Sequence, residues 1–208
     1  MSNRIYAGLE SGKNEFETAR VLLQSVPFDG TSTWGKGADQ GFEAFCDASD
    51  NMEIYDIETD SEPYLIGVHI LDEIAERKDA EKMFQATYET TQKMLKTGKF
   101  LTAFGGEHSI NIGIIKAHYE HFENLTVLQM DAHTDLRPEY HGTPYNHACA
   151  VYDASKNANL IQVGIRSMDV SEKEHLDYNK VYFAENIMDN DYWMEEALGK
   201  MTDNVYIT

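Results

Sequence analysis

Short hydrophobic runs alternate along this chain with longer stretches in which apolar side chains recur at every third or fourth position. Apolar runs bounded by turn-forming residues predict strands, and the helical spacing predicts helices. We expect strands over residues 20–27, 51–60, 64–69, 99–104, 125–130, 160–165, 180–183 and 204–208. We expect helices over residues 38–48, 72–97, 109–121, 147–154 and 189–201.

Strands that alternate with helices are typical of an α/β domain with a mainly parallel sheet. No internal repeat, linker or low-complexity segment interrupts the pattern. We therefore expect a single domain over residues 1–208, with ligands held at the carboxyl ends of its strands.

Composition sets further limits. The chain has 208 residues, enough to bury a core, and no apolar run is long enough to span a bilayer. Residues 1–13 have no apolar stretch like that of a signal peptide. Two cysteines, Cys46 and Cys149, indicate no disulfide framework. The cytoplasm is the expected location.

The formal net charge is −19. This charge argues against nucleic acid and anionic membranes as partners, because both repel an acidic protein. It would favour the approach of a cationic substrate, but the simpler explanation is an acidic surface that serves only solubility.

The strongest chemical signal follows the strand predicted over residues 125–130. Asp131, His133 and Asp135 come at alternate positions, which places their side chains on one side of an extended backbone. Two carboxylates and an imidazole are costly to crowd together without a cation. The pattern predicts a divalent metal site, and the alternative is an ordinary turn in which an Asp caps a helix.

A second strand end favours the metal. The strand predicted over residues 99–104 runs into Gly105 and Gly106, and His108 follows at the start of a helical stretch. Two ligand-bearing strand ends in one sheet converge at the same edge. Among the other histidines, we expect His69 to be structural, and His118 and His121 to be exposed at the polar end of a helix.

A glycine-rich loop over residues 28–37 follows the first predicted strand. Its glycines allow close backbone approach to another group, or the segment is a plain strand-to-helix connection. The irregular loop over residues 136–146 contains two prolines, and irregular loops at strand ends are where substrates are often held.

These motifs together resemble the ureohydrolase family of arginases and agmatinases, and the resemblance covers nearly the whole chain. The matching segments are Pro27–Ser32, Gly105–Ser109, Asp131–Asp135, His147–Cys149 and Gln162–Ser167. The resemblance implies a three-layer α/β/α fold with a mainly parallel sheet. It also implies a hydrolase with two Mn²⁺ ions that cleaves a guanidinium group to an amine and urea.

The resemblance also assigns roles by position. His108 would bind the first manganese and His133 the second, and Asp131 would bridge both. Asp135 would bind the first metal and hydrogen-bond the hydroxide that bridges the two metals. His147 resembles the proton-shuttling histidine, and it would protonate the leaving amine together with Asp135. The alternative for His147 is an ordinary histidine at a helix start.

Substrate choice depends on the loop between Asp135 and His147, which looks more like agmatinases than arginases. We therefore expect agmatine as the substrate, cleaved to putrescine and urea in polyamine metabolism. Arginine or a guanidino acid is the alternative. Asp169 is a candidate for contact with the distal amine of the substrate, and a lone loop Asp is otherwise simply solvated.

One expected motif is missing. Family members carry a later S-x-D-x-D strand end that provides two more aspartates, and the present sequence stops at Thr208, inside a predicted strand. We expect a fragment of a longer protein, with the C-terminal part of the fold absent. The alternative is a non-catalytic relative that lacks the second metal. The resemblance also implies a homo-oligomer, either a trimer or a hexamer.

Overall fold

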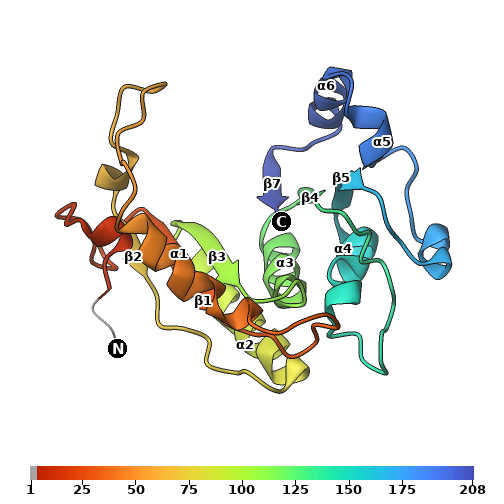
Figure 1. Cartoon of the computed structure of the whole chain (residues 1–208), viewed down its shortest axis with the longest axis horizontal. Coiled ribbons are helices and arrows are strands. Elements are labelled where there is room, and N and C mark those ends of the chain that lie inside the picture. Colours follow the sequence, from red (N-terminus) through yellow and green to blue (C-terminus); the bar gives the residue numbers. More distant parts are fainter. Residues whose placement is uncertain (1–3) are drawn as a thin grey trace. The chain divides into compact units, whose positions relative to one another are not determined.

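A computed structural model describes residues 4–208, and this part of the chain forms two compact units, divided between Glu107 and His108. Every strand ladder between the named strands is parallel. Strands alternate with helices in both units (Figure 1). The expected α/β fold with a mainly parallel sheet is confirmed.

The first unit contains a three-stranded sheet in the order β2-β1-β3. Its strands are β1 (Val21–Val26), β2 (Val68–Ile70) and β3 (Phe100–Gly105), and its α-helices are α1 (Gly41–Ser49) and α2 (Ala80–Leu95). Helix α1 buries Phe42 and Cys46 against Leu23 of β1. Asp79 caps the start of helix α2: its side chain accepts a hydrogen bond from the Lys82 amide and so satisfies a free donor of the first turn.

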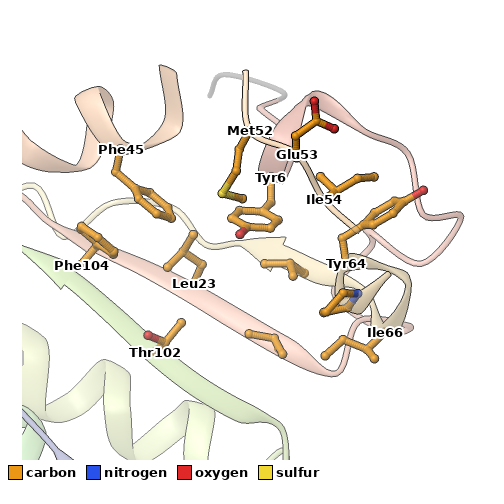
Figure 2. A pocket seen from close by; sticks show the side chains of 13 residues that line it. Tyr6, Leu23, Phe45, Met52, Glu53, Ile54, Tyr64, Ile66, Thr102 and Phe104 are labelled. Atoms are coloured by element: carbon orange, nitrogen blue, oxygen red, sulfur yellow. The ribbon is translucent and has the colours of Figure 1, made fainter. Parts of the chain in front are cut away.

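The sheet of the first unit also borders an apolar pocket of about 330 Å³. Its walls include the aromatic side chains of Tyr6, Phe45, Tyr64 and Phe104. Glu53 is the one acidic lining residue, and Figure 2 shows its carboxylate directed away from the apolar side chains. None of the predicted metal ligands lines this pocket.

The second unit contains a four-stranded sheet in the order β6-β5-β4-β7. The strands are β4 (Leu125–Met130), β5 (Asn159–Ile165), β6 (Val181–Phe183) and β7 (Asn204–Ile207). Its α-helices are α3 (Ile110–His121), α4 (Tyr152–Asn157), α5 (Ala184–Ile187) and α6 (Tyr192–Gly199).

Helices cover both faces of this sheet. One apolar cluster joins Ile115 of α3 and Ala154 of α4 to Val127 of β4. A separate cluster joins Ala197 of α6 to Ile161 of β5. Alternate side chains of a strand point to opposite faces, so the two clusters form the two interfaces of a three-layer α/β/α arrangement.

Some expected elements are wrong in place or extent. Residues 51–60 form no strand, and only an isolated bridge joins Asp56 to Ser61. The helix expected over residues 72–97 begins only at Ala80. The helix expected from His147 divides into a 3-10 turn, His147–Cys149, and the later helix α4.

The two cysteines are free and buried, as expected without a disulfide. Within residues 4–208, no helix combines the length and apolar character needed to cross a membrane.

Candidate metal centre

The segment after β4 turns sharply at the predicted ligands. Strand β4 ends at Met130, and Asp131 follows directly. Asp135 has a φ of 47°, in the left-handed region that few residues other than glycine adopt. This conformation turns the chain back from the strand end, so that Asp131 and Asp135 can face the same volume.

His108 reaches this volume from the chain before α3, and it belongs to the second unit. Strands β3 and β4, whose ends were expected to converge in one sheet, pair in separate sheets. His108 meets Asp131 and Asp135 within the second unit.

Three predicted ligands lie together. His108 Nδ1 is 2.6 Å from Asp135 Oδ2 and 3.3 Å from Asp131 Oδ2. The ligand atoms of all three residues lie within 4.8 Å of one another. Asp135 is buried, and the other two side chains are partly exposed. A cation placed among these atoms could contact all three groups, while solvent still reaches one side.

The donor set fits a divalent cation such as Mn²⁺. It consists of two carboxylates and one imidazole, which suit an oxygen- and nitrogen-binding metal. Burial raises the pKa of the Cys149 thiol, the cysteine of this unit, to about 12. The cluster itself offers only oxygen and nitrogen donors.

His133 lies outside this cluster. Its side chain is 63% exposed, and its Nδ1 is 3.6 Å from Asp131 Oδ1. The His133 amide donates to the same Asp131 oxygen at 2.9 Å. Asp131 therefore faces His108 with one carboxylate oxygen and His133 with the other. The role of His133 at a second metal stays a prediction.

His147 opens the 3-10 turn, and the preceding Asn146 side chain accepts a hydrogen bond from the Ala148 amide. The rings of His147 and Tyr140 lie edge to face, with 6.1 Å between their centroids. The turn at Tyr140 is closed by His141 and Gly142, both with positive φ. These contacts order the loop before His147, whose shuttle role stays a prediction.

Asp169 is already engaged by neighbouring groups. Its carboxylate caps the 3-10 helix Val170–Glu174 and lies 3.4 Å from the Arg137 guanidinium. Hydrogen bonds from the Ser171 hydroxyl and amide hold the pKa of Asp169 below its usual value. Contact between Asp169 and substrate stays a prediction.

Sequence reasoning missed Glu172 and Arg137. Glu172 is 4% exposed and accepts hydrogen bonds from the Thr134 hydroxyl and the Leu136 amide. Arg137 lies 4.4 Å over the Tyr140 ring and near Asp169. The Asp169-x-x-Glu172 spacing is that of a capping box, a signal that could have drawn attention to Glu172.

The fold and the cluster define a parallel-sheet α/β protein with a metal-type site beside the carboxyl end of a strand, the usual place for a ligand in this class. Residues 19–208 match the sequence profile of the arginase family. The chain belongs to the arginase family.

Individual relatives agree with this assignment. The chain is 36% identical over 156 residues to an N(1)-aminopropylagmatine ureohydrolase of Thermus thermophilus, a match that covers 74% of this chain and 53% of the relative. It is 26% identical over 204 residues to an agmatinase of Bacillus subtilis, covering 95% and 69%. The solved agmatine ureohydrolase of Thermoplasma volcanium superposes with a TM-score of 0.83 at 27% identity, covering 100% and 71%.

The match to the Thermus protein thus spans about half of that relative's length.

Proposed function

We propose that this chain carries part of the active site of a Mn²⁺-dependent ureohydrolase that cleaves a guanidino compound to an amine and urea. The observation that carries the proposal is the cluster of His108, Asp131 and Asp135, with ligand atoms within 4.8 Å of one another. Family membership supports the same activity.

These three residues would hold the first Mn²⁺, and His133 with Asp131 would hold a second. The chemistry that such cations supply when bound is a lower pKa of water, which provides hydroxide near neutral pH. The protein must place the guanidinium carbon next to that water and keep the carboxylates ionised around the cationic substrate.

The leaving amine must gain a proton as the carbon–nitrogen bond breaks. In this proposal Asp135 accepts a proton from the attacking water and passes it to the leaving amine, and His147 carries protons between the site and solvent. Asp169 would contact the distal amine of the substrate.

The test is urea release by the 208-residue chain with agmatine, measured with and without Mn²⁺. We expect release only with the metal, and loss of activity on chelation. Asp135→Asn should lower kcat/KM by at least about 100-fold, because it removes a ligand charge and a proton acceptor. Absence of Mn²⁺-dependent urea release from every guanidino compound tried would contradict the proposal.

A second substrate is favoured by one observation, the name of the 36% identical Thermus relative. N(1)-aminopropylagmatine is longer than agmatine and carries one more amine. A panel of agmatine, this compound, arginine and guanidino acids separates the candidates by kcat/KM. Asp169→Asn should raise KM for the preferred amine and leave kcat nearly unchanged if Asp169 binds it.

The proposal also covers the oligomeric state, the cellular location and the pathway of the protein. We infer a trimer or hexamer, tested by light scattering, and a cytoplasmic location, tested by fractionation of cells. Turnover of agmatine to putrescine would place the protein in polyamine biosynthesis.

A further inference from the structure

Asp135 holds a backbone conformation that needs support. Its φ of 47° is sparsely populated for a residue with a side chain, and such conformations persist only where the surroundings fix them. The residues on both sides of Asp135 are hydrogen-bonded to buried side chains, and these hydrogen bonds support the conformation of Asp135.

Glu172 accepts hydrogen bonds from both chain neighbours of Asp135. One carboxylate oxygen, Oε1, accepts a hydrogen bond from the Thr134 hydroxyl at 2.9 Å and from the Leu136 amide at 2.8 Å. Thr134 and Leu136 are the two chain neighbours of Asp135, and both are fully buried. A single oxygen therefore fixes the chain immediately before and immediately after the metal ligand.

Two buried amides complete the support. Gln162 Nε2 donates to the Thr134 carbonyl at 2.8 Å and to Gln129 Oε1 at 2.6 Å. Gln129 Nε2 donates to the His133 carbonyl at 3.1 Å. The segment from His133 to Leu136 thus has its polar backbone groups held from strands β4 and β5 as well as from Glu172.

A carboxylate is an expensive choice for a buried position, because its charge loses hydration. Glu172 also closes a capping box, and there its other oxygen, Oε2, accepts from the Asp169 amide at 2.6 Å. The two oxygens have different partners. Oε2 serves the cap and lies 3.9 Å from Nε of Arg137, which offsets part of the cost of the charge. The contacts of Oε1 are with the segment that carries Asp135.

We propose that Glu172 and Thr134 are positioning residues that hold Asp135 in its metal-binding orientation. The inference rests on the proposed metal site. Groups behind a metal ligand typically change metal affinity about 10- to 100-fold when they are removed. Neither residue needs to touch the metal or the substrate in this role.

The decisive variant is Thr134→Val, which removes the hydroxyl, keeps the side-chain volume and leaves the capping box intact. Thr134→Ser restores the hydroxyl. Thr126→Val is the matched control, because Thr126 is also fully buried in the second unit, and its hydroxyl oxygen accepts from Asn159 Nδ2 and the Thr202 amide at the other end of β4.

The first measurement is the Kd for Mn²⁺ of each variant, obtained by calorimetric titration. We expect Thr134→Val to weaken the Kd about 10-fold or more, and Thr134→Ser and Thr126→Val to stay within about 2-fold of wild type, below the usual size of such effects. Equal affinity of Thr134→Val and wild type overturns the inference. Equal weakening in Thr126→Val overturns it as well, because the cause would then be general loss of stability.

The second measurement is the hydrogen-exchange rate of the Leu136 amide in metal-free protein, which tests its hydrogen bond to Glu172 independently of metal binding. We expect faster exchange in Thr134→Val than in Thr134→Ser and Thr126→Val, and unchanged exchange overturns the inference. If wild type binds no Mn²⁺ the proposed function fails, while the exchange result still decides whether Glu172 and Thr134 hold this segment.

Discussion

Burial changes the chemistry of one histidine that the sequence predicted to be exposed. His118 is 8% exposed, its Nδ1 lies 2.8 Å from the Ile114 carbonyl oxygen, and its ring centroid is 4.8 Å from that of Tyr206. Desolvation lowers the pKa of His118 below its ordinary value. The helix position looked polar, but the aromatic side chain of β7 covers it.

This burial predicts an acid sensitivity. Below about pH 6.5 the unfolded chain binds a proton at His118 more readily than the folded protein does, so the free energy of unfolding falls as the pH decreases. His118→Phe keeps a ring and cannot bind a proton. We expect urea unfolding curves between about pH 7 and 5 to show a shallower acid-side loss in this variant. An identical pH dependence in both proteins would show that His118 contributes nothing.

The functional role of a residue could be predicted from the sequence where its partners are close along the chain. Asp131 and Asp135 share one short segment, and their residue types and spacing were enough to suggest a ligand set. Glu172 could not be found this way, because its importance comes from two donors 36 and 38 positions earlier in the chain. A buried charge is recognised only when its partners are known.

At the scale of elements, the turn after β3 lies tightly against the loop that follows β1. The Gly106 amide donates to the Val26 carbonyl at 3.1 Å, and the Glu107 amide donates to the Phe28 carbonyl at 2.9 Å. A Cβ on Gly106 would lie 1.9 Å from the Phe28 carbonyl oxygen. Only glycine fits there without movement of the backbone.

We therefore expect Gly106→Ala to destabilise the protein by about 1–3 kcal/mol, as overpacking typically does. Gly199→Ala is the control, since a Cβ there meets no heavy atom within 4 Å. The control should change stability by less than about 1 kcal/mol. Urea denaturation of both variants makes the comparison, and a Gly106→Ala protein as stable as the control would show that the two loops can separate without cost.

Element types followed from the apolar pattern wherever that pattern was strong. The strand expected over residues 125–130 is β4, because a short, mostly apolar run suits a strand covered on both faces. The strand expected over residues 51–60 was wrong, since Met52 and Ile57 are exposed and these residues form no strand. The Asp79 cap sets the start of α2. The expected helix began too early because helical spacing of apolar residues alone does not mark the cap.

At the scale of the whole molecule, the division into two units could not be read from the sequence, because no linker or change in composition marks residue 107. Whether the units act as one domain stays a prediction. All three clustered ligands lie in the second unit.

A ligand that binds only the folded state stabilises the part of the protein whose opening releases it. At a Mn²⁺ concentration about 100 times Kd, this stabilisation is about 2.7 kcal/mol, or about 100-fold slower hydrogen exchange. We expect slowing in β4 and β5 of the second unit and little in β1 and β3 of the first. Asp135→Asn with the same Mn²⁺ controls for loose binding to an acidic protein of net charge −19. Equal slowing in both units would mean that they open together. No slowing in either unit would show that Mn²⁺ does not bind at this site.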